Sequence, residues 1–402
     1  MNCLSELIFS KKNYTKQNIF YNEFCIFGIK FRLKDLKTTT KYQSKIIESY
    51  KLFADNLINL LRTPAIAEKK ILIVEPNRFH GEVIPGYIKY FSELGFNTDV
   101  IVLPEVMEYN PFCRLNLKNV NIYTLDRNLI NVFLSSPKVN EYDIILFTTF
   151  DTYSKNSPTI FDTFPNIKEY IEKLIVVEHR TESADINLKN NKQIIILANL
   201  NPESGYIFAN PHYFGDVNIT SKNKNITEFI TVGTMKSFRK NSNLLIDAVK
   251  KLDKSGIDNF KINIIGKETL KNIPIKIRKY FNILGKVDFE TMYKAMEQSD
   301  FFLPLLDTEI PEHERYIKTG TSGSFQLIYG FKKPCLLAEK FAKIHYFNSE
   351  NSILYKHNED LADSMKAAIN MTDESYLNMQ QNLKNTADEI YKISLENLSK
   401  II

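Results

Sequence analysis

Glycine is scarce in this chain. It accounts for 13 of 402 residues, less than half of the roughly 7% found in average proteins. Two of the thirteen stand three positions apart in the stretch TGTSGSFQ (319–326), which also carries four hydroxyl side chains. Two interpretations of this cluster are open. It forms a plain turn before a helix, or it forms a loop whose backbone N–H groups bind phosphate, since the amino ends of helices attract anions.

Cysteine is also sparse. Cys3, Cys25, Cys113 and Cys335 lie far apart and form no CxxC pair, which argues against a zinc site and against a disulfide framework. A reducing cytoplasm is therefore the expected compartment. The sequence contains no other metal-ligand spacing, no Ser-His-Asp order and no GxGxxG fingerprint. We expect no metal and no bound cofactor.

Long apolar runs are missing as well. No stretch of 18 or more apolar residues occurs, so no segment is predicted to span a bilayer. The first residues lack the apolar core of a signal peptide. The 52 basic and 47 acidic residues nearly balance, and no dense basic block or RNA-binding signature appears, so nucleic acid is not an expected partner. The small positive excess suits a phosphate-bearing substrate or an anionic membrane surface.

Residues 1–66 differ from the rest and are predicted to form a helical and basic N-terminal extension. FGIKFRLK (27–34) mixes bulky apolar and basic residues, and apolar residues from Ile46 to Leu61 recur at helical spacing. Two interpretations are open. The helix packs on the main body, or the extension rests on the inner face of the cytoplasmic membrane through its basic and aromatic residues.

Strands and helices alternate regularly from Lys70 onwards. Near-continuous Ile, Val and Leu runs are typical of parallel sheets that are covered on both faces. The first unit has expected strands at 71–76, 98–103, 142–150, 173–180 and 193–200. After a linker at 207–225, the second unit has them at 226–233, 260–266, 280–287, 301–306 and 334–340. The sequence therefore predicts an α/β protein with two successive doubly wound units, and such sheets bind ligands at the carboxyl ends of their strands.

Several stretches of these units resemble the GT-B glycosyltransferases, most of all the family 4 type that builds bacterial surface polysaccharides. HGEVIPGYIKYFSELGFNTDV (80–100) resembles the opening loop, helix and second strand. KLIVVEHR (173–180) places His179 at the end of a strand, where related enzymes often carry a histidine that faces the sugar. TVGTMKSFRKNSNLLIDAVKKL (231–252) resembles the start of the donor domain. ILGKVDFETMYKAMEQSDFFLPLL (283–306) and TGTSGSFQLIYGFKKPCLLAEK (319–340) resemble the segments around the nucleotide. The resemblance extends over about residues 70–385.

The resemblance implies two Rossmann-like domains that face a cleft. Residues 67–218 would bind the acceptor, residues 219–385 the nucleotide-sugar donor, and a helix at 386–402 would cross back to the first domain. The implied reaction moves a sugar from a UDP or GDP donor to a surface glycan, such as lipooligosaccharide, capsule or a lipid-linked glycan. Two alternatives stay open: a GT-B-like protein that binds nucleotide or glycan without catalysis, and a nucleotide-sugar epimerase.

On the donor side, the resemblance implies that Lys240 contacts the diphosphate. The arginine that often follows the glycine in the family is replaced by Thr234, so Lys236 or Arg239 is the candidate for the missing charge. Fixed cations and amide donors should face the leaving diphosphate, because negative charge builds on it. The expected diphosphate-binding residues are Gly233, Thr234, Arg239, Lys240, Thr319, Gly320, Thr321, Ser322, Gly323 and Ser324. The residues expected to border the nucleotide base are Gly285, Lys286 and Val287.

On the acceptor side, the attacking hydroxyl must lose a proton. The candidate bases are His80, Glu82 and His179, and histidine has a suitable unperturbed pKa. Gly81 lies in the same loop, which in the family covers the acceptor or the donor phosphates. Purely structural roles for the two histidines also stay open, and His212 in the linker is expected to be structural.

One family feature is absent. Many members carry two glutamates eight residues apart before the donor helix, and the second holds the ribose. Here Glu312 and Glu314 are followed at that distance by Gly320 and Ser322, which leaves the ribose contact and the stereochemical outcome open. Two interpretations of the acidic run that contains them are open: it is a solvated loop, or it contacts the sugar hydroxyls. Its members are Asp307, Glu309, Glu312 and Glu314.

Overall fold

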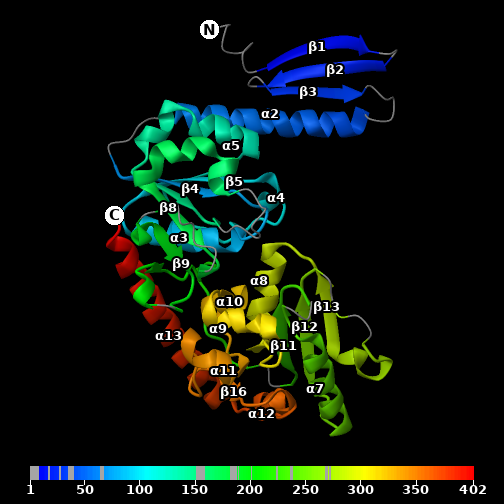
Figure 1. The fold of residues 1–402 in the computed structure, drawn as a ribbon. Coiled ribbons are helices and arrows are strands. Elements are labelled where there is room, and N and C mark those ends of the chain that lie inside the picture. The colour runs from blue at the N-terminus through cyan, green and yellow to red at the C-terminus, as the bar shows by residue number, and fades with distance from the viewer. Residues whose placement is uncertain are drawn as a thin grey trace.

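The computed structural model contains two α/β domains, with a small sheet and a helix beside the first and a long C-terminal helix along both (Figure 1). Side chains are described from residue 48 onwards. The described residues are 9–16, 19–26, 29–34, 40–63, 68–150, 159–181, 188, 190–200, 202–222, 225–235, 239–267, 270 and 273–402.

The first domain is built on a seven-stranded parallel sheet with the order β10-β9-β8-β7-β4-β5-β6. Its strands are β4 (Lys70–Glu75), β5 (Asn97–Val102), β6 (Val120–Thr124), β7 (Ile144–Phe147), β8 (Leu174–Glu178), β9 (Ile194–Ile196) and β10 (Ile207–Phe208). All residues of β4, β7, β8 and β9 are buried. The strand order reverses between β4 and β7, which makes this the topological switch point, where open α/β sheets bind ligands.

Helices and 3-10 turns connect these strands. The α-helices are α3 (Ile84–Glu93), α4 (Pro104–Met107), α5 (Arg127–Leu134) and α6 (Ile160–Thr163). The 3-10 turns are η1 (Gly81–Val83), η2 (Pro137–Glu141), η3 (Pro165–Lys173), η5 (Asn191–Gln193) and η6 (Pro202–Ser204).

The second domain repeats the same winding. Its parallel strands are β11 (Thr227–Val232), β12 (Phe260–Ile265), β13 (Phe281–Gly285), β14 (Phe301–Phe302), β15 (Leu336–Ala338) and β16 (Ile353–Tyr355). Four of them form a sheet with the order β13-β12-β11-β14, and an isolated bridge from Phe302 to Cys335 continues it to the β15-β16 pair. A second switch point therefore lies between β11 and β14.

The helices of this domain cover both faces of its sheet (Figure 1). They are α7 (Ser242–Lys254), α8 (Phe289–Gln298), α9 (Arg315–Lys318), α10 (Gly323–Phe331), α11 (Glu339–Ala342) and α12 (Leu361–Asn370). The 3-10 turns are η7 (Ile275–Tyr280), η8 (Pro311–Glu314), η9 (Lys343–His345) and η10 (Asn358–Asp360).

The N-terminal extension departs from the predicted helical segment. Its first half is an antiparallel sheet of β1 (Phe9–Lys16), β2 (Ile19–Ile26) and β3 (Ile29–Lys34). Only the second half is helical, as α2 (Thr40–Arg62). Leu57 and Leu60 of α2 are fully buried, and the Asn56 amide donates to the Thr124 carbonyl at the end of β6. The end of α2 therefore packs on the main body.

The alternative role of the extension, contact with a membrane, depended on the basic and aromatic residues of 27–34. Residues 27 and 28 and the side chains of 29–34 lie outside the described part of the structure. None of the helices in the described residues is long and apolar enough to cross a membrane.

The last helix, α13 (Asp373–Ser399), contacts both domains. Near its start, the Tyr376 hydroxyl donates to the Asp300 carbonyl of the second domain at 2.8 Å. Near its end, the Asn397 amide donates to the Phe208 carbonyl of β10 in the first domain at 3.0 Å. The helix predicted at 386–402 is the second half of α13, which begins at Asp373 in the second domain and continues without a break.

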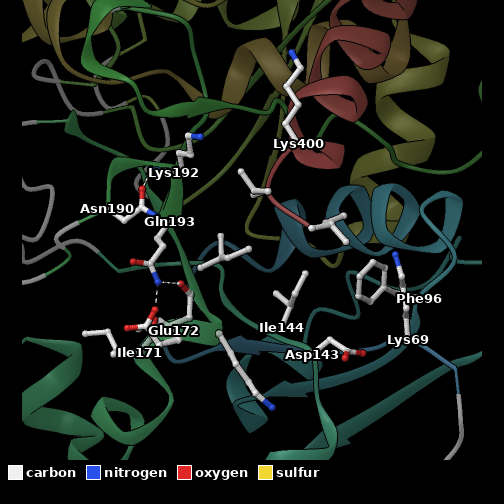
Figure 2. Close-up of a pocket in the computed structure, with 15 residues that line it drawn as sticks. Lys69, Phe96, Asp143, Ile144, Ile171, Glu172, Asn190, Lys192, Gln193 and Lys400 are labelled. Atoms are coloured by element: carbon white, nitrogen blue, oxygen red, sulfur yellow. Dashed lines mark hydrogen bonds between the residues drawn. The ribbon is translucent and has the colours of Figure 1, made fainter.

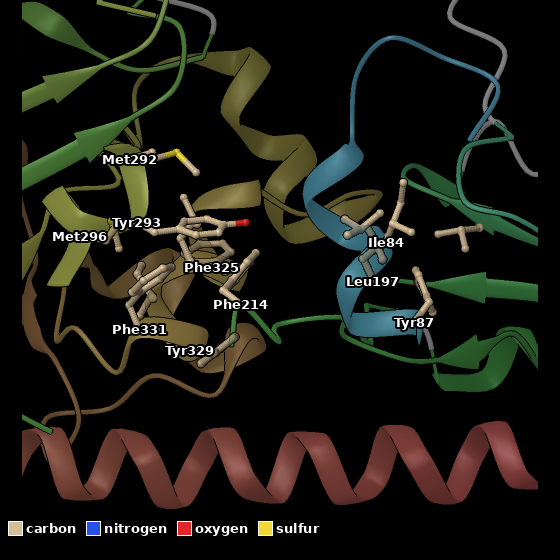
Figure 3. Close-up of a cluster of buried hydrophobic side chains, with 14 of the residues drawn as sticks. Ile84, Tyr87, Leu197, Phe214, Met292, Tyr293, Met296, Phe325, Tyr329 and Phe331 are labelled. Carbon is tan, nitrogen blue, oxygen red and sulfur yellow. The ribbon is translucent and has the colours of Figure 1, made fainter. Parts of the chain in front are cut away.

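The segment after β10 packs on the second domain before β11 begins. The Phe214 ring lies 5.6 Å from that of Tyr293 and 5.5 Å from that of Phe331. Figure 3 shows these rings together with Met292, Met296, Phe325 and Tyr329, while Ile84, Tyr87 and Leu197 form a separate group in the first domain, and α13 runs past both. His212 of this segment is buried and contacts the Ala387 carbonyl of α13 at 3.1 Å. Burial lowers the pKa of His212 to about 4, so the ring is neutral and suits the structural role expected for it.

Two glycines meet where β11 and β12 end. Gly266 has φ +147°, and a Cβ placed on it would lie 2.1 Å from the Gly233 carbonyl oxygen. We expect Gly266→Ala to lower the free energy of unfolding by about 3 kcal/mol or more, because backbone must shift to admit the methyl group. Gly256→Ala is the matched control, since Gly256 also has a positive φ but faces open space, and should cost about 1 kcal/mol. Urea unfolding measures the free energy of unfolding of both variants. Equal decreases would show that the close approach of Gly266 to Gly233 does not require glycine.

Candidate active site

The carboxyl edges of the two sheets meet through the TGTSGS loop. The Thr181 amide donates to the Thr319 carbonyl at 2.7 Å, and Arg180 and Gly320 form an isolated antiparallel bridge. A Cβ on Gly320 would lie 2.9 Å from the His179 carbonyl oxygen, so glycine permits this close approach. The contact places the end of β8, with His179, directly against the loop that leads into α10.

A second contact joins the domains at the start of α8. The Phe289 amide donates to the Tyr109 carbonyl at 2.9 Å. The Arg114 guanidinium forms two hydrogen bonds with the Glu297 carboxylate, at 2.5 and 2.8 Å. Lys286 places its Nζ 3.6 Å from the centre of the Tyr109 ring. The segment predicted to border the nucleotide base, Gly285 to Val287, therefore lies at the interface between the domains.

The three candidate bases come together at the first switch point. The His80 and His179 rings lie 4.2 Å apart, centre to centre. His80 Nδ1 is 3.4 Å from Glu82 Oε1. Burial by itself would raise the pKa of Glu82, but the hydrogen bond and charge of His80, with a weaker contribution from His179, hold it below its usual value. Both histidines and the carboxylate are partly exposed, so all three can be reached by a substrate.

Local backbone geometry fixes the two imidazoles. His80 has φ +66°, a left-handed conformation that directs the chain into η1. His179 Nε2 is 3.0 Å from the Thr148 carbonyl oxygen at the end of β7. A carbonyl only accepts, so Nε2 carries the hydrogen, and in the neutral ring the lone pair lies on Nδ1. Gly81 is buried, and a Cβ on it would lie 2.8 Å from Val106 Cγ1, which explains this glycine by packing against α4.

Glu75 is a residue of this site that the sequence analysis did not identify. It ends β4 and is fully buried. Its carboxylate accepts hydrogen bonds from the Thr148 and Thr149 hydroxyls and from the Asn77 amide, each at 2.8 Å. In the sequence Glu75 is only the charged end of a strand before a proline, because its two threonine partners lie more than 70 residues away.

Lys240 is the central residue among those predicted to bind the donor diphosphate. It is only 4% exposed, so it is not a solvated lysine at a helix start. Its Nζ donates to the Pro304 carbonyl at 2.9 Å and to the Ser324 hydroxyl at 3.1 Å. Burial lowers the pKa of Lys240 to about 7. In the described part of the chain no carboxylate lies within ion-pair distance of this ammonium group.

The other predicted donor residues surround Lys240 to different degrees. Gly233 and Thr234 follow β11, and a Cβ on Gly233 would lie 3.3 Å from Lys240 Cε. Arg239 is exposed, and Lys236 lies outside the described residues. The switch point between β11 and β14 thus brings the glycine of one loop, the lysine of the next segment and the start of α10 together.

The TGTSGS loop supplies the amino end of α10. Ser322 caps the helix, with its hydroxyl accepting from the Ser324 amide at 3.3 Å. The Thr321 hydroxyl is buried and has no hydrogen-bond partner in the described structure. The same holds for both amide atoms of Gln326, a residue that the sequence analysis did not identify and that is 2% exposed. Buried polar atoms without partners are uncommon, and these lie on the segment that Lys240 contacts.

The acidic run is only partly solvated, so the interpretation as a solvated loop is wrong for Asp307. Asp307 is 3% exposed, and its carboxylate accepts hydrogen bonds from Asn241, Asn358 and the Glu309 amide. It therefore holds the N-cap of α7 in place. The remaining members of the run, Glu309, Glu312 and Glu314, are exposed or partly exposed.

A cavity of about 870 Å³ lies elsewhere in the first domain (Figure 2). It is lined by the residues that begin β7 and β8, by those just before β4, β5 and β9, and by residues 400–402 at the end of the chain. The strand positions mark the amino ends of the parallel strands, the edge opposite to His80 and His179. Because ligands of open α/β sheets bind at the carboxyl ends, we assign the candidate site to the facing edges and not to this cavity.

Comparison with known proteins supports the architecture. No family model matches the sequence, and no curated protein matches it. A structure described as trehalose-6-phosphate from E. coli bound with UDP-2-fluoro glucose is similar, with a TM-score of 0.51 and 9% identity over 83% of this chain and 99% of that one. AviGT4, a glycosyltransferase involved in avilamycin A biosynthesis, has a TM-score of 0.50 and 10% identity over 82% and 98% of the two chains. The two doubly wound domains, their facing carboxyl edges and these likenesses show that the chain has the GT-B fold.

Proposed function

We propose that this protein is a glycosyltransferase that moves a sugar from a nucleotide diphosphate donor to a glycan acceptor. The observation that carries the proposal is Lys240. A buried ammonium group is costly, and among the described residues no carboxylate pairs with this one, which stands at the switch point of the second sheet and contacts the start of α10. A bound diphosphate would supply the missing negative charge at this position.

The donor would bind with its diphosphate on Lys240 and the amino end of α10. Sugar transfer breaks the bond between the anomeric carbon and the diphosphate oxygen, so negative charge grows on the leaving group. A fixed cation and helix amides stabilise such charge without needing to reorganise. The hydroxyl of Thr321 and the amide of Gln326 are candidates for polar contacts to the same donor, because both are buried without partners in the described structure.

The acceptor would bind on the side of His80 and His179. Its hydroxyl oxygen forms the new bond to the anomeric carbon and releases its proton to an imidazole nitrogen. Glu82 beside His80 would stabilise the resulting imidazolium. The Thr181–Thr319 and Arg180–Gly320 contacts bring this half of the site to the phosphate loop, as transfer between two bound substrates requires.

The donor class and the acceptor class belong to the proposal as well. One of the similar structures is described as bound with UDP-2-fluoro glucose, and the other as a glycosyltransferase of avilamycin A biosynthesis. We therefore place a UDP donor first and a GDP donor second. For the acceptor we propose a growing surface glycan, such as lipooligosaccharide, capsule or a lipid-linked glycan.

A thermal-shift panel of UDP, GDP, CMP and their common sugar conjugates tests the donor assignment. A ligand that binds only the folded state raises the melting temperature by mass action. At a ligand concentration of one hundred times its Kd, the free energy of unfolding rises by about 2.7 kcal/mol. We expect a shift with one nucleoside diphosphate class only. Release of free nucleotide on addition of a glycan acceptor would identify a transferase. Conversion of the donor to an altered sugar without acceptor would identify an epimerase instead, and no shift with any nucleotide would contradict the donor site.

A further inference from the structure

Glu75 occupies the centre of the first domain's switch point. It is the last residue of β4, the strand next to β7 at the point where the strand order reverses. Its side chain is fully buried, and all three of its hydrogen bonds come from neutral groups: two threonine hydroxyls and one backbone amide. Burial raises the pKa of Glu75 to about 7, and the charge of His80 opposes that rise. Burying a carboxyl group in a protein core lowers the free energy of unfolding, which points to a role for Glu75 other than stabilising the fold.

One chain of contacts joins Glu75 to His179. The Thr148 hydroxyl donates to Glu75 Oε2 at 2.8 Å, and the carbonyl oxygen of the same residue is 3.0 Å from His179 Nε2. Thr148 therefore links the carboxylate of β4 to the imidazole that follows β8. Any shift of Glu75 that moves Thr148 also moves the group that fixes the His179 ring.

A second chain joins Glu75 to His80. The Asn77 amide donates to Glu75 Oε1 at 2.8 Å and so ties down the start of the loop that ends in His80. Arg127 of α5 also holds the start of this loop, because its Nε donates to the Pro76 carbonyl at 3.2 Å. The loop adopts the left-handed conformation at His80. Because the start of the loop is held by hydrogen bonds, the position of His80 is restrained.

We infer that Glu75 is a positioning residue that orients both imidazoles and stabilises their protonated forms. This inference rests on the proposed function, in which an imidazole takes the proton of the acceptor hydroxyl. In that step the hydroxyl O–H bond breaks, the oxygen bonds to the anomeric carbon, the nucleoside diphosphate leaves with the bonding electrons, and the proton ends on the imidazole. Glu75 does not touch the substrates; its charge acts through the two rings.

Other charged groups surround the two rings and set the background for this effect. Glu82 in η1 lies beside His80, and Glu178 precedes His179 at the end of β8. Arg180 follows His179, and Arg127 contacts the Pro76 carbonyl at the start of the loop. Glu82 favours the protonated form of His80, because its carboxylate lies 3.4 Å from the ring nitrogen. A Glu75 variant keeps all four of these side chains. A difference in histidine titration between the wild type and the variant is therefore due to Glu75.

Glu75→Gln is the test, because glutamine keeps the size of the side chain, loses its charge and leaves each partner able to form a hydrogen bond. Its carbonyl oxygen can accept from the Asn77 amide and its NH₂ can donate to the Thr149 hydroxyl. The Thr148 hydroxyl already lies 3.3 Å from the Val74 carbonyl and can donate there. Above pH 7, where Glu75 carries its charge, we expect the sugar-transfer rate to fall at least tenfold. We expect the acid limb of the pH profile to move to lower pH, because the protonated imidazole loses a nearby negative charge. Nucleotide binding should not change.

An independent readout separates this inference from the proposed function. The imidazole NMR signals of His80 and His179, assigned with His80→Asn and His179→Gln, can be titrated in the ligand-free protein. We expect Glu75→Gln to lower both titration midpoints. Asp99→Asn is the control: Asp99 is another buried carboxylate of this sheet, bonded to Lys70 and Tyr142, and its loss should leave the midpoints unchanged. Unmoved midpoints in Glu75→Gln would overturn the inference even if transfer is observed. Moved midpoints in a protein without transferase activity would uphold the coupling and refute the proposed function.

Discussion

Replacing Lys240 with methionine should weaken the binding of the nucleoside diphosphate at least about 100-fold. Methionine has a similar length and is compatible with burial, but it cannot donate to phosphate oxygens. The loss of one charge-assisted hydrogen bond in a buried site corresponds to about 3 kcal/mol. Isothermal titration calorimetry measures the loss directly. Unchanged binding of every nucleotide would show that the diphosphate lies elsewhere.

Lys240 should also take up a proton when the donor binds. With a pKa near 7 in the ligand-free protein, its amine is mostly neutral at pH 8, and a bound diphosphate favours the charged form. We expect uptake of up to about one proton at pH 8, seen as a dependence of the binding enthalpy on the ionisation enthalpy of the buffer. Lys240→Met should remove that dependence.

The same pKa shift predicts the stability of the variant without ligand. The pKa of Lys240 is depressed on folding from 10.5 to about 7. The cost of burying the ammonium therefore develops as pH falls from about 10 to 7. The melting temperature of Lys240→Met should exceed that of the wild type by a margin that grows as pH falls through this range.

Lys333→Met is the matched control for both measurements. Lys333 is another buried lysine of the second domain, with its Nζ donating to the Glu297 carbonyl at 2.8 Å, and burial lowers its pKa to about 8. Its removal should change stability but not nucleotide affinity. Equal losses of affinity in the two variants would mean that Lys240→Met acts by perturbing the fold.

Replacing either histidine of the pair should lower kcat for sugar transfer by about 10²- to 10⁴-fold, the usual contribution of a general base. His80→Asn suits the left-handed backbone at φ +66°, because asparagine tolerates that conformation. His179→Gln keeps an N–H that can reach the Thr148 carbonyl. Donor affinity should stay within about twofold, since neither side chain belongs to the diphosphate site.

The double variant shows whether the two rings act together. Residues that serve one step as a unit lose activity non-additively, so the double variant should be no slower than the slower single variant. His357→Gln, on the exposed turn before η10, is the control and should retain full activity. If both single variants keep wild-type kcat, the acceptor proton goes to another group, and Glu82 is then the next candidate.

The sequence predicted the buried parts of the fold well. The apolar runs of β4, β5, β7 and β8 mark strands because both faces of a parallel sheet are covered. β6 is an edge strand with partly exposed side chains, so its pattern lacks the continuous run. β10 has only two residues and lies inside the segment predicted to be a linker.

The site was predicted unevenly for a similar reason. Lys240, His179 and the TGTSGS loop stand at strand ends and helix starts, where local pattern and family resemblance both indicate a function. Glu75 becomes recognisable only when β4 pairs with β7 and brings Thr148 beside it. The orphan amide of Gln326 likewise depends on burial, which the helix pattern of α10 alone does not reveal. Long-range pairing and burial are what the sequence could not supply.

The attachment of α13 to both domains limits how they can move apart. The helix is 27 residues long, about 40 Å at 1.5 Å per residue, and its two ends are bonded to different domains. It acts as a spine along one side of the molecule. Small contacts, such as Arg114–Glu297 and Arg180–Gly320, hold the domains together elsewhere. Because both ends of the helix are bonded, a relative motion of the domains that preserves these bonds is a rotation about the side on which α13 lies.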